Sequence, residues 1–297
     1  MTEHTAPPPH LNVGGRVLAA IDASGYTDSV SRWAAWAAAR LDAPLEYLHV
    51  LDRHPEAAAI ADFSGNLALD SREKLLQDLV AVDESRSRLG QERGRLLLQQ
   101  AKAIAADAHG VAADTRLRHG SLVDMLTELE SDVRLFVLGK RGEHADFAKG
   151  HLGGQLERVV RAVHRPLLVA SRGFIEVKRV LVAFDGSPTT RKGVEMVADS
   201  PLFRGLEIEL VTVGTANDAS SAQMRWALDA LASAGLAAHG GFLAGEPEVA
   251  IAEHVRDARI DLLVMGAYGH SRIRQLIVGS TTTTMLRTCH VPVLLLR

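Results

Sequence analysis

Short apolar runs alternate with longer amphipathic stretches along most of the chain. Apolar runs bounded by turn residues are typical of buried strands, whereas apolar positions that recur every three or four residues are typical of helices. In the first half we expect strands at Val17–Ile21, Leu45–Leu51, Val111–Leu117, Leu135–Leu138 and Leu167–Ala170. In the same half we expect helices at Thr27–Leu41, Asp70–His109, Leu122–Glu130 and Gln155–Val163.

The second half shows the same alternation. Its expected strands are Val180–Phe184, Glu207–Val213, Ala237–Leu243, Leu262–Met265 and Val293–Leu296. Its expected helices are Thr190–Asp199, Ser220–Ala234, Val249–Ala258 and Thr281–Thr288. Strands that alternate with helices predict an α/β fold, in which parallel sheets carry helices on both faces. We therefore expect two tandem, doubly wound, five-stranded parallel sheets with strand order 3-2-1-4-5.

The chain also repeats itself. Three segments of the first half correspond, in the same order, to three segments of the second: Arg16–Ser24 to Arg179–Ser187, Leu135–Gly142 to Leu262–Gly269, and Val163–Val169 to Cys289–Leu295. The repeat predicts two domains, at residues 14–172 and 173–297, preceded by a disordered lead at residues 1–13.

The first copy is longer because of an insertion that falls mostly within Leu51–Gly110. Apolar residues in its second part lie on one helical face: Leu97, Ala101, Ile104, Ala105 and Ala108. Gly90 and Gly94 are expected to divide the region into two helices. Two interpretations remain open, a long helix packed on its own sheet and a surface that docks a partner.

The stretch from Gly266 to Thr281 is the strongest candidate for chemistry. It follows a buried strand, precedes a helix and contains no acidic residue, but it is rich in the following glycine, arginine and hydroxyl residues: Gly266, Gly269, Gly279, Arg272, Arg274, Ser280 and Thr281. Bare backbone N–H groups and a helix N-terminus favour an anion, most often phosphate. The same residues also suit an ordinary turn in which Ser280 caps the helix. Neither a G-x-x-x-x-G-K-[ST] nor a G-x-S-x-G sequence occurs.

Asp185 is expected to lie near this loop in space. Ligands of open α/β sheets bind at the carboxyl ends of the strands, where the strand order reverses. With order 3-2-1-4-5 that point lies between the strand ending near Asp185 and the strand ending near Gly266. A carboxylate there can accept from a ribose hydroxyl or an adenine amino group. Ser187 and Pro188 then begin a helix as N-cap and first residue.

The spacing Gly266-x2-Gly269-x9-Gly279-Ser280, with the helix and apolar run that follow it, resembles the nucleotide signature of the universal stress protein family. The resemblance covers nearly the whole chain as two tandem copies. It implies an adenine nucleotide alpha hydrolase-like fold and ATP, with or without Mg²⁺, as the ligand. It also implies a pseudo-dimer inside one chain, in which Leu167–Ala170 pairs with Val293–Leu296.

The resemblance also assigns site residues in the second copy. Asp185 matches the residue that contacts adenosine, and Val213 matches one that lines the adenine pocket. The cofactor-binding residues it implies are Ala183, Asp185, Val213, Met265, Gly266, Gly269, His270, Arg272, Gly279, Ser280 and Thr281. No catalytic or metal-ligating residue is predicted, because no nucleophile–base set and no metal-type histidine spacing is visible.

The first copy departs from this pattern. Gly154 replaces the serine after the last glycine, and Gln155 stands where the second copy has Thr281. Glu143 and Asp146 place negative charge inside the loop. Because hydroxyl donors are lost and anion repulsion is gained, we expect only the second copy to bind ATP well.

Composition narrows the class of protein. Apolar residues make up 47% of the chain, and the formal net charge of −3 comes from interspersed acidic and basic residues. This balance argues against a nucleic-acid partner, which needs clustered Lys and Arg. The single cysteine, Cys289, suits a reducing compartment. The N-terminus lacks the features of a secretory signal and no apolar run is long enough to span a bilayer, so we expect a cytoplasmic protein with no membrane partner.

Three functions are compatible with these features. The first is a nucleotide-binding stress-response regulator that acts on an unknown protein partner. The second is an enzyme, either a slow ATPase or a transferase that cleaves at the α-phosphate. The third is an interaction scaffold that needs no nucleotide. A homodimer of the whole chain is compatible with the sequence but is not decided by it.

Overall fold

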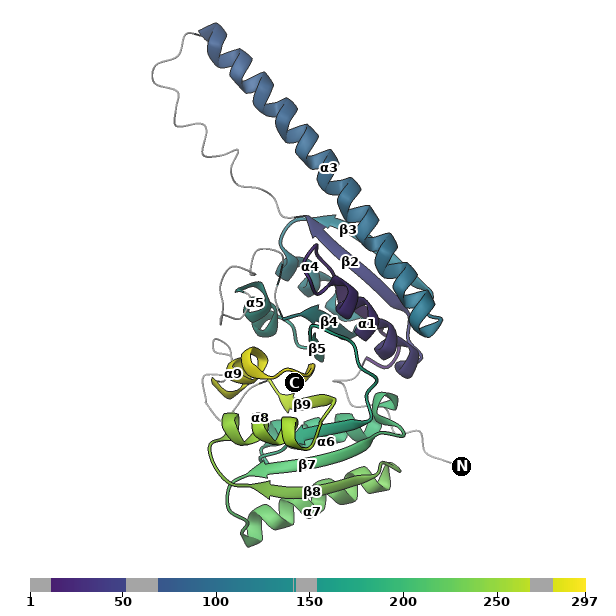
Figure 1. Ribbon diagram of the computed structural model, residues 1–297, viewed down its shortest axis with the longest axis vertical. Coiled ribbons are helices and arrows are strands. Elements are labelled where there is room, and N and C mark those ends of the chain that lie inside the picture. Colours follow the sequence, from purple (N-terminus) through teal and green to yellow (C-terminus); the bar gives the residue numbers. More distant parts are fainter. Residues whose placement is uncertain (1–11, 52–68, 141, 143–153, 268–279) are drawn as a thin grey trace.

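A computed structural model of the chain describes residues 12–51, 69–140, 142, 154–267 and 280–297. Almost all of the expected disordered lead lies outside these residues. Helices flank a single ten-stranded sheet in the order β3-β2-β1-β4-β5-β10-β9-β6-β7-β8 (Figure 1). The α/β class predicted from the alternating pattern is therefore confirmed.

The first half contributes the strands β1 (Arg16–Ala20), β2 (Leu45–Leu51), β3 (Ala113–His119), β4 (Val133–Gly139) and β5 (Leu167–Ala170). Its helices are α1 (Thr27–Leu41), α3 (Leu69–His109), α4 (Leu122–Leu129), η2 (Glu130–Asp132) and α5 (Gly154–Ala162).

The second half contributes the strands β6 (Arg179–Ala183), β7 (Glu207–Val213), β8 (Ala238–Leu243), β9 (Leu262–Gly266) and β10 (Val293–Leu296). Its helices are α6 (Pro188–Asp199), η3 (Pro201–Phe203), α7 (Asp218–Ser233), α8 (Pro247–Asp257) and α9 (Ser280–Thr288).

Each half has the predicted strand order 3-2-1-4-5, and every strand pair within a half is parallel. The halves join where β5 and β10 pair in antiparallel fashion, with Val293 opposite Val169 and Leu295 opposite Leu167. The predicted pairing of the two edge strands is confirmed, and it merges the two expected sheets into one. Each edge strand thereby satisfies backbone groups that would otherwise face solvent.

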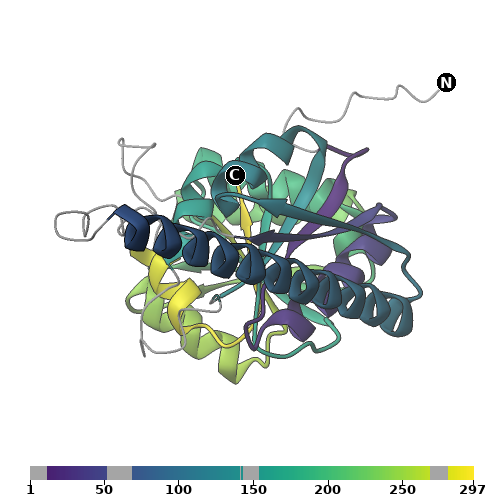
Figure 2. The ribbon, with the colours of Figure 1, turned by 90° about the horizontal axis from the view of Figure 1, so that it is seen from above.

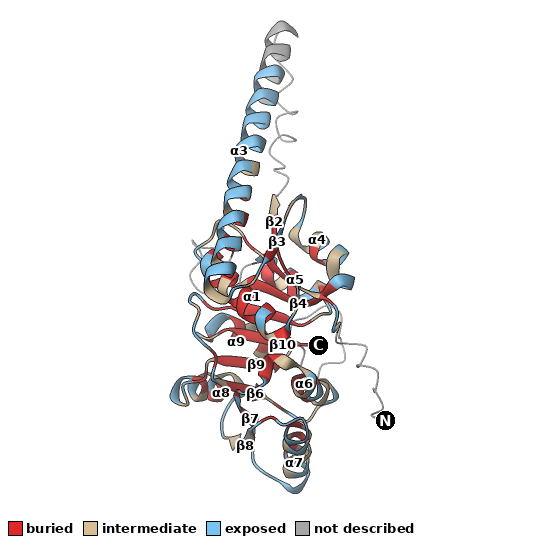
Figure 3. Cartoon of the chain, turned by 90° about the vertical axis from the view of Figure 1, so that its right-hand side faces the viewer, coloured by how far each residue is buried: buried red, intermediate tan, exposed pale blue. Residues whose placement is uncertain are grey.

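The hydrophobic core crosses this junction on both faces of the sheet. Leu294 belongs to a cluster on one face, whereas Val293 and Leu295 belong to a cluster on the other. Both clusters contain buried residues from both halves, as the continuous red centre of Figure 3 shows. Burying one such side chain stabilises the fold by roughly 1.5–3 kcal/mol, so the two halves stabilise each other.

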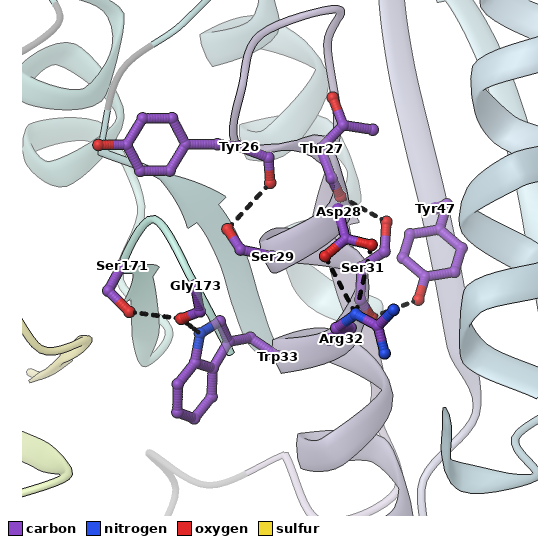
Figure 4. A network of polar contacts seen from close by, with 10 residues as sticks. All are labelled: Tyr26, Thr27, Asp28, Ser29, Ser31, Arg32, Trp33, Tyr47, Ser171 and Gly173. Atoms are coloured by element: carbon purple, nitrogen blue, oxygen red, sulfur yellow. Dashed lines mark hydrogen bonds and ion pairs between the residues drawn. The ribbon is translucent and has the colours of Figure 1, made fainter. Parts of the chain in front are cut away.

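The connection between the halves is fixed to the first half by polar and aromatic contacts. The carbonyl oxygen of Gly173 accepts from Trp33 Nε1 at 3.2 Å and from Ser171 Oγ at 2.9 Å (Figure 4). The ring of Phe174 packs edge-on against Trp33, with centroids 4.8 Å apart. On the same side of the sheet, Arg40 Nε donates to the carbonyl oxygen of Leu202 at 2.7 Å.

Helix α3 is continuous over 41 residues, so the predicted break at Gly90 and Gly94 is wrong. A glycine costs a helix about 1 kcal/mol but keeps its backbone hydrogen bonds. Gly94 is needed for close packing, because a Cβ there would lie 2.7 Å from His49 Cδ2 and 2.8 Å from Leu117 Cδ1. The second part of α3 packs along α1, β2 and β3, whereas its first part projects beyond the body (Figures 1 and 3).

The packed face of α3 differs slightly from the predicted one. Ala101 and Ala105 are fully buried as expected, but Leu98 is more deeply buried than Leu97. The helix ends at a left-handed Gly110, after which Val111 N donates back to the carbonyl oxygen of Ala105. This cap uses the residue at which β3 was expected to begin. Within the part of the chain that the structure describes, no helix could span a bilayer.

Candidate functional site

The candidate site lies at the carboxyl ends of the central strands of the second half. Strand β6 is hydrogen-bonded to β9 on one side and to β7 on the other. The ends of these strands therefore lie side by side: Ala183 at the end of β6, Gly266 at the end of β9 and Val213 at the end of β7. The strand order reverses between β6 and β9, as the sequence predicted.

Asp185 is held in the turn that leads from β6 into α6. Its Oδ1 accepts from Ser187 N at 2.9 Å and from Thr190 Oγ1 at 2.7 Å. Ser187 in turn caps α6, since its side chain accepts from Thr190 N, and Pro188 is the first residue of the helix. The predicted cap is confirmed. The result is an exposed carboxylate whose direction is fixed by two donors.

A residue not predicted from the sequence lies against this turn. Gly186 has a left-handed φ of +72°, and a Cβ there would lie 1.9 Å from Gln223 Oε1 on α7. The turn therefore needs glycine for its conformation, and any larger residue would also displace the end of the Gln223 side chain. A glycine directly after Asp185 indicates a turn, but nothing in the sequence indicates that Gly186 lies against Gln223.

A cation–aromatic pair flanks the same turn. The Arg191 guanidinium lies 4.8 Å from the centroid of the Trp226 ring, and Arg191 Nε donates to the carbonyl oxygen of Gly186 at 3.2 Å. The Trp226 ring also stacks on Phe184 at 6.4 Å. Thr212 Oγ1 donates to the carbonyl oxygen of Phe184 at 2.7 Å, which fixes the end of β7 against the end of β6.

The first turn of α9 is attached to the end of β9. Thr282 Oγ1 lies 3.4 Å from the carbonyl oxygen of Gly266 and 3.3 Å from that of Ala267. The N-terminus of α9, with the partial positive charge of a helix start, therefore lies beside the strand ends. Thr281 is the second residue of this helix, and its Oγ1 donates to Glu248 Oε1 at 2.9 Å.

Glu248 was not among the residues predicted from the sequence. Glu248 lies in the first turn of α8, where a carboxylate interacts favourably with the helix dipole. This preference is the only feature of the local sequence that indicates where the residue lies. Its contact with Thr281 joins residues far apart in the chain. The candidate anion site therefore has an acidic side chain at its edge.

The structure places six of the eleven predicted residues at or beside this carboxyl edge: Ala183, Asp185, Val213, Met265, Gly266 and Thr281. The Met265 side chain is buried in the core, so only its backbone is at hand for a ligand. Ser280 begins α9, but its side chain is not described. Gly269, His270, Arg272 and Gly279 lie outside the described residues.

The equivalent edge of the first half has a different arrangement. Asp22 keeps the turn, since its Oδ1 accepts from Ser24 N at 3.0 Å. A Cβ on Gly142 would lie 3.1 Å from Asp22 Oδ2, so the backbone of the degenerate loop lies close to this carboxylate. Helix α5 begins at Gly154, with no hydroxyl side chain at that position.

Lys140, from the same degenerate loop, points across to the second half. Its Nζ donates to the carbonyl oxygens of Cys289 and, at 3.1 Å, of Val291, in the segment that connects α9 to β10. Burial lowers the pKa of Lys140 from 10.5 to about 8, and the neighbouring Cys289 opposes this shift. Burial also raises the pKa of the Cys289 thiol. This lysine therefore serves an inter-half contact and not its own strand-end site.

Among the described residues, no group of three or more His, Cys, Asp or Glu side chains is arranged to hold a metal ion. His254 Nε2 contacts Glu209 Oε1 at 2.8 Å and His239 lies 3.8 Å from the same carboxylate, but these three lie along β7, β8 and α8, away from the strand ends.

Comparison with known proteins agrees with this architecture. The model of the universal stress protein family matches residues 15–171 and again residues 176–297. Universal stress protein Slr1230 from Synechocystis sp. is 37% identical over 284 residues, which cover 95% of this chain and 99% of that protein. Universal stress protein Rv2005c from Mycobacterium tuberculosis is 23% identical over 306 residues, with 95% and 96% covered.

A solved structure has the same fold. The crystal structure of a universal stress protein from Archaeoglobus fulgidus aligns with a TM-score of 0.65 at 19% identity and covers 96% of each chain. The two matches of the family model fall on the two halves of the ten-stranded sheet. The chain belongs to the universal stress protein family and carries two tandem copies of its domain.

Proposed function

We propose that the second domain, within residues 173–297, binds ATP, and that the first domain, within residues 14–172, does not bind it well. The observation that carries the proposal is the junction of Asp185, Gly266 and the N-terminus of α9 at one strand-order reversal. A directed carboxylate on one side and helix N–H donors on the other suit the two ends of a nucleotide.

Each part of the site has a role in this proposal. Asp185 accepts a hydrogen bond from the adenosine part, and Val213 lines the adenine pocket. Backbone groups of Ala183, Met265 and Gly266 lie along the ribose and phosphates. The phosphates are held by the loop and helix start that the family resemblance assigns: Gly269, His270, Arg272, Gly279, Ser280 and Thr281.

Glu248 adds a condition to phosphate binding. A phosphate that accepts from Thr281 competes with the Glu248 carboxylate, which accepts from the same hydroxyl at 2.9 Å. Two like charges this close repel each other unless a cation lies between them. Mg²⁺ bound to the phosphates would supply that cation, so we propose that the ligand is the magnesium complex of ATP.

The proposed physiological role is regulatory. In this role the chain is a cytoplasmic stress-response regulator that couples nucleotide binding to a protein partner. It contacts neither nucleic acid nor membrane. Turnover separates this role from a slow ATPase or a nucleotidyl transferase: bound ATP should turn over more slowly than about once per minute, whereas ordinary enzymes run near 10 per second.

A matched pair of variants of the full chain tests the proposal. Asp185→Asn keeps an acceptor for Ser187 N but removes the charge, and Asp22→Asn makes the same change at the equivalent turn of the first domain. Because a charge-assisted hydrogen bond contributes about 1.5–3 kcal/mol, Asp185→Asn should weaken ATP binding by roughly tenfold to a hundredfold. Asp22→Asn should leave it unchanged.

Calorimetric titration of ATP, with and without Mg²⁺, gives both affinities and the number of sites. One site that is weakened only by Asp185→Asn supports the proposal. Two equivalent sites, an equal effect of both variants, or no binding to the full chain would each refute it. The whole chain is used because the halves share one core across β5 and β10.

A further inference from the structure

The contact between Glu248 and Thr281 joins the first turns of two neighbouring helices at the carboxyl edge of the sheet. Helix α8 packs against α9, and Figure 2 shows the two side by side in yellow-green and yellow. Glu248 is the second residue of α8, Thr281 is the second residue of α9, and Glu248 Oε1 accepts from Thr281 Oγ1 at 2.9 Å. An acidic side chain therefore lies where the start of α9 favours an anion.

The first domain carries neither partner of this contact. Helices α4 and α8 each begin two residues after a glycine with positive φ, so Val123 of α4 is equivalent to Glu248. Val123 packs against the core, and Gln155 stands at the position of Thr281. The first domain packs the same pair of helices without an acid there. The acid–hydroxyl pair is therefore particular to the domain with the proposed nucleotide site.

A phosphate at this helix start competes with Glu248 and is repelled by it. The Thr281 hydroxyl has one proton, so it donates either to the carboxylate or to a phosphate oxygen. A phosphate oxygen that accepts from Thr281 lies at most about 6 Å from the carboxylate, because two hydrogen-bond lengths separate them. At this distance two unit charges near a protein surface repel strongly enough to weaken binding by roughly tenfold to a hundredfold.

A divalent cation on the phosphates changes this repulsion into an attraction. Mg²⁺ sites commonly combine one or two carboxylates with phosphate oxygens and water, so a carboxylate at this edge suits a ligand that brings the cation with it. A triphosphate chelates Mg²⁺ through more than one phosphate group, whereas a monophosphate binds it weakly. A metal-free triphosphate carries only negative charge. Glu248 thus acts differently on ligands that share the same adenosine.

We propose that Glu248 is a selectivity residue, which makes the second domain accept metal-bound polyphosphates and reject metal-free nucleotides and monophosphates. The inference rests on the proposed function, since it concerns the same site. It goes further because it assigns the choice among adenine nucleotides to one side chain, which the family resemblance does not assign. The carboxylate excludes the other ligands by charge repulsion and not by shape.

Glu248→Gln in the full chain tests the role of the charge. The carboxamide oxygen can still accept from Thr281 Oγ1, so the contact and the side-chain length are retained while the charge is lost. Glu246→Gln is the matched control, because Glu246 is an exposed acid two residues earlier whose side chain makes no capping hydrogen bond. It removes one negative charge from the same helix start but keeps the acceptor of Thr281. Circular dichroism checks that both variants keep the fold.

Calorimetry gives the dissociation constant of ATP in excess Mg²⁺ and in EDTA, and the ratio of the two measures the preference for the metal-bound form. In the unchanged chain and in Glu246→Gln, ATP should bind at least about tenfold more weakly in EDTA. In Glu248→Gln this ratio should fall by roughly tenfold, chiefly because metal-free ATP binds more tightly. AMP should gain about tenfold in affinity in Glu248→Gln but not in Glu246→Gln.

The outcomes separate this inference from the proposed function. Equal binding of ATP to the unchanged chain in Mg²⁺ and in EDTA would overturn the role of Glu248, and so would the same ratio in both variants. Nucleotide binding by the second domain would stand in either case. An unchanged affinity of Glu248→Gln for AMP would overturn the selectivity against monophosphates. No binding of ATP to the unchanged chain in Mg²⁺ would instead refute the proposed function, and this inference with it.

Discussion

Replacement of Lys140 by methionine tests the contact between the degenerate loop of the first domain and α9 of the second. Lys140 is 8% exposed, and its ammonium group donates to the backbone carbonyl oxygens of Cys289, directly after α9, and of Val291, which precedes β10. Cations favour the C-terminal end of a helix, where the unpaired carbonyl groups carry partial negative charge. Burial nevertheless makes the charged form expensive.

The sign of the pH effect follows from the lowered pKa. In the unfolded chain Lys140 has its ordinary pKa of 10.5, and in the folded chain its pKa is about 8. Between these values the unfolded state holds the proton more tightly, so the free energy of unfolding rises with pH in this window. The full shift corresponds to about 3 kcal/mol. Integrated from about pH 7 to pH 9.5, the gain is roughly 2 kcal/mol.

Urea denaturation followed by tryptophan fluorescence measures this gain at several pH values. Other groups also titrate in the window, so the quantity to compare is the pH-dependent change in the unchanged chain minus that in Lys140→Met. It should be about 2 kcal/mol. Lys102→Met is the matched control, because Lys102 is exposed on α3 and should keep the profile of the unchanged chain. Parallel profiles for the unchanged chain and Lys140→Met would refute the reasoning.

Two further changes test the packing described above. Gly94→Ala should lower the free energy of unfolding by about 1–3 kcal/mol, because its Cβ meets the buried ring of His49, whereas Gly90→Ala should raise it by up to about 1 kcal/mol. Urea denaturation of both variants checks this, and the same sign for both would contradict it. Trp33→Phe loses the hydrogen bond to Gly173 and should cost about 1 kcal/mol or more, with faster proteolysis at the connection between the domains; unchanged stability and cleavage would argue against that contact.

Most of the fold could be predicted because it depends on local patterns. Strands such as Leu45–Leu51 and Leu167–Ala170 have the predicted bounds, since a buried strand is a short, mostly apolar stretch with turn residues at its ends. The strand order was predicted from the doubly wound α/β pattern, and the edge pairing from the resemblance to the universal stress protein family. Errors occurred where packing decides between local alternatives, as at Gly94, where glycine allows close contact with β2 and does not end the helix.

The candidate site was less predictable because its contacts join distant residues. The strand-end Asp185 and the cap at Ser187 carry local signals, and the structure shows both. No local pattern predicts the contact of Glu248 with Thr281 or that of Gln223 with the turn after Asp185. From the sequence alone, Glu248 and Gln223 could equally be solvent-exposed helix residues. The hydrogen bond from Lys140 to the carbonyl oxygen of Val291 also joins residues far apart in the chain and could not be predicted from the sequence.

The two domains carry different residues at equivalent positions, and these differences change how the helix before the last strand of each domain is attached. Lys140 occupies the position of Ala267, directly after the fourth strand of its domain, and Leu156 occupies the position of Thr282. Thr282 attaches α9 to its strand end, whereas Leu156 is buried in the core. Thus the first domain uses apolar packing where the second uses hydroxyl groups.

These differences between the domains affect both ends of helix α9. Its N-terminus lies at the proposed phosphate site, and its C-terminal end is held by the ammonium group of Lys140 from the other domain. A positive charge there adds to the favourable field along the helix axis and restricts how the helix can move. The contact from Lys140 therefore links the loop of the first domain to the helix whose other end lies at the strand ends of the second domain.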